Sequence, residues 1–244
     1  MSDLIASSEH RLRRRSAEIS RLLQSSEQFK ESSISTLESY VESQVTDKNY
    51  DFGANKQLIK LYQFFPSNCQ GEILAKVLAM AMMARPATDL KALLYMCPEA
   101  LIEINPLAKR VIQCESLLAA AKFAEFWQQA MNAEESLDTL IPGFSASIRR
   151  FILDLLALTY QSLSIDVCAP ILGLSTDQLR TLTTSPPAGL PLLPSTDPVF
   201  IKFIPNQENQ PRHLAAGKSV QLSTLLDLAA PQDDPFHHIS EISS

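Results

Sequence analysis

Long apolar runs, glycine and paired cysteines are all scarce in this 244-residue sequence, which contains six glycines and four cysteines. A helix that crosses a bilayer needs about 20 consecutive apolar residues, and no stretch approaches that length. The N-terminus lacks the apolar core of a signal peptide, and acids near its basic cluster Arg11–Arg15 argue against a mitochondrial presequence. We therefore expect a soluble cytoplasmic protein, with nuclear import left open by the basic cluster.

Ligand sets for a metal ion are also absent from the sequence. No two cysteines stand at CxxC spacing, and no histidine has a cysteine or histidine partner at metal-ligand spacing. Each cysteine lies in or beside an apolar helical run, which favours reduced, mostly buried thiols in a cytosolic protein. The residues concerned are Cys69, Cys97, Cys114, Cys168, His10, His213, His237 and His238.

The motifs of phosphate binding and nucleophilic catalysis are incomplete. Gly217-Lys218-Ser219 matches the end of a P-loop, but Arg212 stands where the motif needs its first glycine. Ser145 follows a Pro-Gly loop instead of the buried strand that precedes a hydrolase nucleophile, so a helix cap is the better interpretation. No paired carboxylates are placed for acid–base work. We expect a protein that is not an enzyme and binds no cofactor.

Net positive charge is missing as well. The 27 Asp and Glu residues outnumber the 21 Lys and Arg residues, so the formal net charge is −6. The surface as a whole repels phosphate, and nucleic acid is not the default partner, although a local basic patch could still bind it. With 45% hydrophobic residues, the chain can bury a sizeable core in one or two domains.

Helical periodicity is the main feature that the sequence does contain, and it is clearest up to Pro66. A first run of apolar residues recurs at helical spacing, while Glu38 and Glu42 fall on the opposite face, where we expect solvent. Asp51 can cap a second helix, and Pro66 ends it because proline cannot donate a helical hydrogen bond. The two apolar stripes comprise Ile34, Leu37, Val41, Val45, Leu58, Ile59, Leu61, Tyr62 and Phe65.

Prolines divide the following sequence into further helices. Short connections between helices of similar length favour antiparallel hairpins, and an irregular helical-repeat stack is predicted. A single tryptophan beside aliphatic helices is normally buried, so we expect Trp127 in the core, together with Tyr62 and Leu118. The predicted helices span residues 67–84, 87–96 and 107–122, followed by the aromatic cluster of Phe123, Phe126 and Trp127.

The pattern changes after Pro142 to three helices followed by strands, which is the plan of a winged helix. A turn at Gly173 separates the second helix from the third, and Pro170 should kink or shorten the second. β-branched and aromatic residues predict a strand at Val199–Ile204, with Lys218–Leu222 as its plausible partner. Caps are available at Ser145 or Ser147 for the first helix and at Ser175 or Thr176 for the third.

The stretch TLESYVESQ, followed by NYDFGANKQLIKLYQFFP, resembles the k subunits of eukaryotic translation initiation factor three. Three further pieces match in order: the cluster Phe123–Trp127, the run Gly143–Ile152 and the segment Thr159–Gln161. The resemblance covers about residues 19–184. It implies a PCI-type protein that lacks an active site and combines a HEAT-like helical domain with a winged helix.

The expected fold class is therefore mainly α, with a HEAT-like helical-repeat domain followed by a winged-helix domain that has a small β-hairpin. The N-terminal extension should contain one helix, and a Pro-rich insertion should form an extended loop in the second domain. The expected boundaries are 1–33 for the extension, 34–140 for the helical domain, 141–222 for the winged helix with its insertion at 185–198, and 223–244 for a C-terminal helix and tail.

The resemblance also implies a function and partners. It implies a non-catalytic scaffold subunit of the initiation factor three complex, bound chiefly to the l subunit, and to the small ribosomal subunit through the complex. A PCI-like subunit of the proteasome lid or signalosome is one alternative, and a winged-helix nucleic-acid binder is another. The predicted recognition helix Thr176–Thr184 has one arginine against one aspartate, whereas phosphate contacts need several cations. No membrane and no specific DNA are expected.

We expect the partner interface on the predicted strand, because it is apolar on both faces and Lys202 is its one charged residue. One face can pack on the core, while the other face or the strand edge would remain open to a neighbouring subunit. The alternative is that the Pro-rich segment or residues 222–229 fold back over it. The candidate interface residues are Val199, Phe200, Ile201, Lys202, Phe203 and Ile204.

Overall fold

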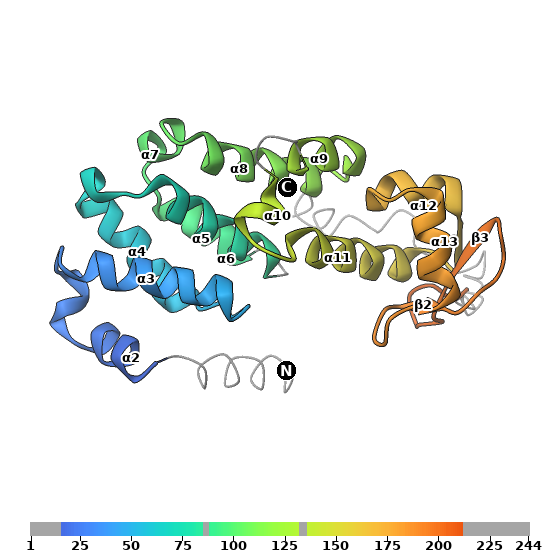
Figure 1. The fold of residues 1–244 in the computed structure, drawn as a ribbon, viewed down its shortest axis with the longest axis horizontal. Coiled ribbons are helices and arrows are strands. Elements are labelled where there is room, and N and C mark those ends of the chain that lie inside the picture. The colour runs from blue at the N-terminus through green and yellow to red at the C-terminus, as the bar shows by residue number, and fades with distance from the viewer. Residues whose placement is uncertain (1–15, 85–87, 132–135, 212–244) are drawn as a thin grey trace, which may run out of the picture. The chain divides into compact units, whose positions relative to one another are not determined.

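The computed structural model describes residues 16–84, 88–131 and 136–211, and Figure 1 shows that helices make up most of them. The described residues up to Asn209 belong to one compact unit. A small antiparallel sheet of three strands lies beside the last helices. The predicted fold class, mainly α with a small β element, is confirmed. None of the described helices is both long enough and apolar enough to cross a bilayer.

The first helices follow the predicted periodicity. Ile34, Leu37 and Val41 are buried, and their helix packs on the next one. Asp51 caps that next helix as predicted, since its carboxylate accepts the backbone N–H of Ala54 at 3.2 Å. The elements are α2 (Ala17–Gln24), which is the helix predicted for the N-terminal extension, η1 (Ser26–Phe29), α3 (Ser33–Thr46) and α4 (Phe52–Phe64).

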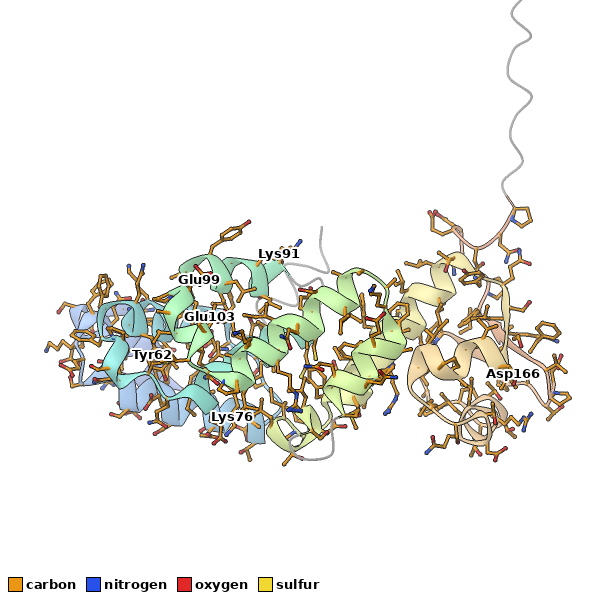
Figure 2. The ribbon with its side chains drawn as sticks, turned by 90° about the horizontal axis from the view of Figure 1, so that it is seen from above. Tyr62, Lys76, Lys91, Glu99, Glu103 and Asp166 are labelled. Carbon is orange, nitrogen blue, oxygen red and sulfur yellow. The ribbon has the colours of Figure 1, made fainter. Side chains whose placement is uncertain are left out.

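The prediction that Glu38 is solvated is wrong. Its carboxylate lies in the core, where it accepts the hydroxyl of Tyr62 at 2.7 Å and the side-chain amide of Gln70 at 2.7 Å. A buried carboxylate tolerates the loss of water when strong donors replace it. Tyr62, labelled in Figure 2, is fully buried, and its burial and the bond to Glu38 raise its pKa well above the ordinary value. Glu42, as predicted, stays exposed.

Helix α5 (Gly71–Met83) is buried along its length from Ile73 to Met82 and contacts α3 and α11 as well as neighbouring helices. Lys76 lies within this buried run (Figure 2), and its ammonium reaches Glu42 and Glu72 at 2.7 Å each. A long aliphatic stem permits such burial with a paired charge. The pKa of Lys76 is lowered by burial and raised by both hydrogen bonds, and the net change is upward.

The remaining helices of the first half lie close to the predicted ranges. One short helix, α7, was not predicted because Pro98 and Pro106 leave only a few residues between them. Leu118 and Trp127 are buried, as expected. The elements are η2 (Pro66–Asn68), α6 (Thr88–Met96), α7 (Glu99–Glu103), α8 (Pro106–Ala119) and α9 (Phe123–Ala130).

Helices α10 (Leu137–Leu140) and α11 (Phe144–Thr159) begin the second half. The predicted serine cap of the long helix is wrong. Gly143 occupies the N-cap position of α11 with a left-handed backbone at φ +91°. Glycine adopts this conformation without steric penalty because it has no Cβ. The backbone N–H of Ser145 is bound instead by the carboxylate of Asp138 at 2.9 Å.

Two helices and a tight turn follow, as predicted. Gly173, at φ +59°, ends α12 (Ile165–Leu172) and turns the chain into α13 (Thr176–Thr184). Ser175 caps α13 through a capping box with Gln178. Pro170 lies inside α12, which is only eight residues long. Figure 1 shows α12 and α13 beside the sheet, with α11 leading toward them.

The sheet has the strand order β1-β3-β2, and both pairings are antiparallel. Strand β3 (Phe200–Phe203) forms within the predicted range. Its partners are β1 (Ser162–Ser164), directly after α11, and β2 (Leu192–Leu193), inside the Pro-rich segment. The strand predicted at Lys218–Leu222 lies outside the described residues.

Candidate protein-interaction surface

The outward face of the small sheet carries apolar side chains that the rest of the unit leaves open. Ile201 and Phe203 point into the core and are buried, whereas Phe200 and Ile204 are each 45% exposed. Lys202 lies between these two and is also exposed. Among the described residues, one face of the strand is buried and the other is exposed, as predicted, and Ile201 and Phe203 belong to the buried face. The segment 222–229, which was the alternative cover for the exposed face, lies outside the described residues.

Strand β2 adds a residue to the open face. Leu193 pairs directly with Lys202 in the register of the sheet, so both side chains lie on the same side. The sequence did not predict Leu193 as part of this surface, because the Pro-rich segment 185–198 was expected to form an extended loop. The sequence signal for a short strand there is the pair Leu192-Leu193 between two prolines. We call Leu193, Phe200, Lys202 and Ile204 the outer sheet face.

The predicted availability of the β3 edge is wrong. Strand β3 is the middle strand: β1 pairs with Phe200–Lys202 on one side, and β2 pairs with Lys202 and Phe203 on the other. Strand β1, which ends 36 residues before β3 begins, supplies one of these pairings, and no local pattern reveals it. The candidate surface is therefore formed by side chains and not by a free strand edge.

Asp197 holds the start of β3 in place. Its carboxylate accepts the backbone N–H groups of Val199 at 2.9 Å and Phe200 at 3.1 Å. These two bonds lower the pKa of the carboxyl, and Lys202, at 3.9 Å, lowers it further. Val199 itself is exposed at the beginning of the strand.

Asn209 ties the end of the outer sheet face to α11. Its side-chain amide nitrogen lies 2.9 Å from the carbonyl oxygen of Ala157, 3.1 Å from that of Ile204 and 3.4 Å from that of Tyr160. Ile204 and the exposed Tyr160 are thereby brought close together. Further exposed large apolar residues of this half are Leu155, Leu158 and Val167.

The predicted recognition helix is present as α13, but its charge is balanced. Arg180 pairs with Asp177 of the same helix at 3.1 Å. No other lysine or arginine occurs between Thr176 and Thr184. A helix that neutralises its own cation offers little attraction to phosphate.

Ser145 has the surroundings of a packing residue. It is buried, and its hydroxyl accepts a hydrogen bond from the guanidinium of Arg149 at 3.2 Å. All four histidines, Arg212 and the Gly217-Lys218-Ser219 segment lie outside the described residues. Within residues 16–84, 88–131 and 136–211, no three His, Cys, Asp or Glu side chains gather at metal-binding distance.

The thiols are poorly suited to nucleophilic chemistry. Burial raises the pKa of Cys69, Cys114 and Cys168 to about 12 and that of Cys97 to about 11. The thiolate is the reactive form, and these groups remain thiols at neutral pH. All four are free, and all but the half-buried Cys69 are buried.

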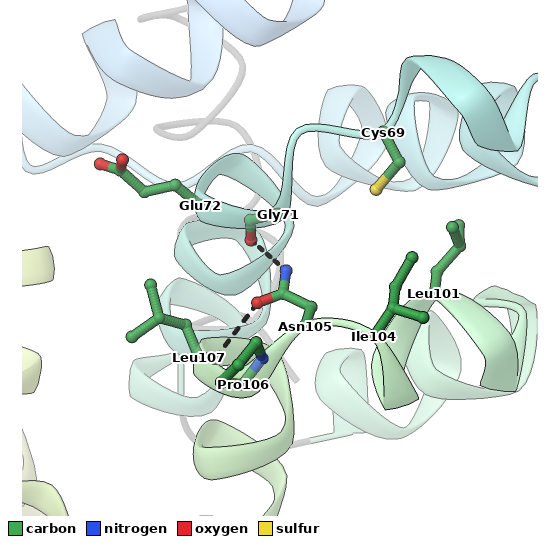
Figure 3. A pocket seen from close by; sticks show the side chains of 8 residues that line it. All are labelled: Cys69, Gly71, Glu72, Leu101, Ile104, Asn105, Pro106 and Leu107. Atoms are coloured by element: carbon green, nitrogen blue, oxygen red, sulfur yellow. Dashed lines mark hydrogen bonds between the residues drawn. The ribbon is translucent and has the colours of Figure 1, made fainter.

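A cavity of about 380 Å³ lies between the starts of α5 and α8, and Figure 3 shows it from close by. Asn105 forms its centre: the side-chain oxygen caps α8, and the side-chain nitrogen donates to the carbonyl of Gly71. A Cβ at Gly71 would lie 2.6 Å from that nitrogen. The polar groups here hold two helices together, so we assign the cavity a structural origin.

Comparisons with known proteins agree with this architecture. The model of the CSN8/PSMD8/EIF3K family matches residues 68–186. Eukaryotic translation initiation factor 3 subunit K of Xenopus tropicalis is 35% identical over 167 residues, which are 67% of this chain and 75% of the relative. The human protein of that name is 34% identical over 167 residues, which again are 67% of this chain and 75% of the relative. The Dictyostelium discoideum protein is 37% identical over 139 residues, 57% of this chain and 55% of the relative.

Proposed function

The chain belongs to the eukaryotic translation initiation factor 3 subunit K family, and we propose that it acts as a non-catalytic scaffold subunit of the initiation factor 3 complex. The family model also covers CSN8 and PSMD8, so that match alone leaves a PCI-like subunit of another complex open. Relatives named subunit K, at 34–37% identity, favour the initiation factor. In this role the protein works in the cytoplasm and reaches the small ribosomal subunit through the complex.

We further propose that the chain divides by role at about residue 141. The helices before it form a HEAT-like stack in residues 34–140, and the elements after it form a winged helix in residues 141–222. The element order supports this division: α11, α12 and α13 are followed by β2 and β3, and β1 completes the sheet.

The outer sheet face is the observation that carries the scaffold proposal. It presents Leu193, Phe200 and Ile204 around a single cation, Lys202. Exposed apolar side chains grouped in this way mark a protein contact more often than a catalytic site. We propose that it binds the l subunit of the same complex, as expected from the sequence for this strand.

A double substitution tests this surface. Phe200→Glu with Ile204→Glu places two charges on the outer sheet face, and both side chains point away from the core. We expect capture of the l subunit with the tagged chain to fall at least about tenfold, as for interface residues that contribute about 2 kcal/mol or more. Quantitative mass spectrometry of the purified complex gives the ratio, and sedimentation with small ribosomal subunits tests the complex as a whole.

The matched control is Tyr95→Glu with Ile104→Glu. This pair also joins an aromatic residue to an isoleucine, and the two side chains are 92% and 77% exposed in the first half. The control should retain the l subunit at the wild-type level. Equal loss in both variants, or full retention by a folded Phe200/Ile204 variant, would refute the assignment of the surface. A wild-type chain that captures proteasome-lid or signalosome subunits instead would refute the initiation-factor role.

A further inference from the structure

A groove that differs in chemistry from the apolar outer sheet face lies where α2 and η1 face α4 and α6. Its volume is about 480 Å³. We call it the lysine groove and define it by Leu23, Phe29, Lys56, Lys60, Gln63 and Met96, which line it. Both lysines come from α4, one helical turn apart, so their attachment points are about 6 Å apart along the helix axis.

The lysine groove is cationic although the chain as a whole is acidic. None of the described residues that line it is Asp or Glu. Neither Lys56 nor Lys60 forms an ion pair with a described residue, whereas Lys30, Lys76 and Lys109 all do. Two unpaired ammonium groups on one side of a groove without carboxylates attract anionic groups.

Apolar and aromatic groups lie beside the two charges. Phe29 is 48% exposed, and the ammonium of Lys60 lies 4.9 Å from its ring centroid. The ammonium of Lys56 lies 5.8 Å from the ring of Phe52. Contacts of this kind restrain the lysine side chains without neutralising them. Leu23 and Met96 complete the apolar part of the groove.

We propose that the lysine groove binds an acidic amphipathic helix of another polypeptide. Carboxylates four residues apart on such a helix match the spacing of Lys56 and Lys60, and its apolar side chains fit against Phe29 and Met96. Single-stranded RNA suits the groove less well. Tracking a phosphate backbone needs several cations, and the lining of the groove supplies two, Lys56 and Lys60.

This inference stands apart from the initiation-factor assignment, because it rests on the groove alone and is tested on the purified full chain. The probe is a fluorescent peptide of about 16 residues built from Glu, Leu and Ala, with glutamates four residues apart. Fluorescence anisotropy should show binding that weakens as salt is added. The same peptide with glutamine in place of glutamate should bind about fivefold more weakly, because two exposed ion pairs together contribute about 1 kcal/mol.

Charge reversal locates the contact. Lys56→Glu with Lys60→Glu should weaken peptide binding at least about tenfold, while circular dichroism confirms the fold. The control Lys91→Glu, a surface change on α6 (Figure 2), changes charge at an exposed lysine outside the groove and should leave the affinity within about twofold. A carbodiimide should join the glutamates of the bound peptide to Lys56 or Lys60, as identified by mass spectrometry.

Three outcomes would overturn the proposal. The first is the absence of salt-sensitive binding of the acidic peptide. The second is equal binding by the groove variant and the Lys91→Glu control. The third is tighter binding of a uridine oligonucleotide of similar length that depends on Lys56 and Lys60, which would assign the groove to RNA.

Discussion

The indole N–H of Trp127 donates to the backbone carbonyl of Ile171 at 2.9 Å and thereby joins α9 to the end of α12. The two residues stand 44 positions apart in the chain. Arg149 of α11 packs over the same ring, with its guanidinium carbon 4.8 Å from the centroid. Three helices from the two halves of the chain therefore meet at one side chain, and the first predictions concern this contact.

Truncation of Trp127 should be costly. The side chain is buried, so Trp127→Ala should lower the free energy of unfolding by about 3–5 kcal/mol. Trp127→Phe keeps an aromatic ring but leaves the Ile171 carbonyl without its donor. This loss should lower the free energy of unfolding by about 1–3 kcal/mol. Urea titrations give both values. Phe64→Ala, at an exposed aromatic residue, is the control and should change stability by about 0.5 kcal/mol or less. A similar small effect at Trp127 would contradict the burial argument.

Gly173 should resist substitution for two separate reasons. Its left-handed backbone disfavours a side chain, and a Cβ would lie 2.6 Å from the Trp127 ring. Gly189 has a similar conformation, at φ +86°, but its nearest neighbour would be 3.7 Å away. Gly173→Ala should therefore destabilise the protein by about 1–3 kcal/mol more than Gly189→Ala, the difference being the forced overlap with the ring. Equal effects in thermal unfolding would show that the ring moves aside freely.

The buried pair of Glu38 and Tyr62 should contribute measurably to stability. Tyr62→Phe removes one of the two donors that replace water around the carboxylate, so we expect a loss of about 1.5–3 kcal/mol. Tyr95→Phe removes a hydroxyl from a side chain that is almost fully exposed and should have no measurable effect. Chemical denaturation of the two variants side by side provides the comparison. No difference between them would mean that water reaches Glu38.

Stability should fall in alkaline solution because of the buried thiols. Burial raises the pKa of Cys114 and Cys168 from 9.0 to about 12, so the unfolded chain releases these protons at a lower pH than the folded chain does. The free energy of unfolding should therefore decrease between pH 9 and 12, by about 1.4 kcal/mol per pH unit for each thiol. Denaturation at pH 8, 9 and 10 measures the slope. Cys114→Ala with Cys168→Ala should reduce the slope by about half, because the pKa values of Cys69 and Cys97 are raised as well. An unchanged slope would rule out Cys114 and Cys168.

Local sequence signals located most of the helices and one strand. Asp51 and Ser175 cap the helices that they were predicted to cap, because a capping bond joins residues only two or three positions apart. Gly173 marks a turn for a similarly local reason, since its left-handed backbone conformation favours glycine. Alternation in β3 correctly separated Phe200 and Ile204 from Ile201 and Phe203, the two core residues that lie between them.

The sequence by itself therefore determined the helical class, the caps, the turn and the position of β3, since periodicity and capping act over a few residues. The tertiary structure alone decided that Glu38 is buried, because Tyr62 and Gln70 come from other segments of the chain. It also placed β3 between β1 and β2, which turned a predicted strand edge into a side-chain surface. The lysine groove has the same origin: Lys60 and Phe29 meet only when α4 packs near η1, and packing between distant segments depends on the whole core.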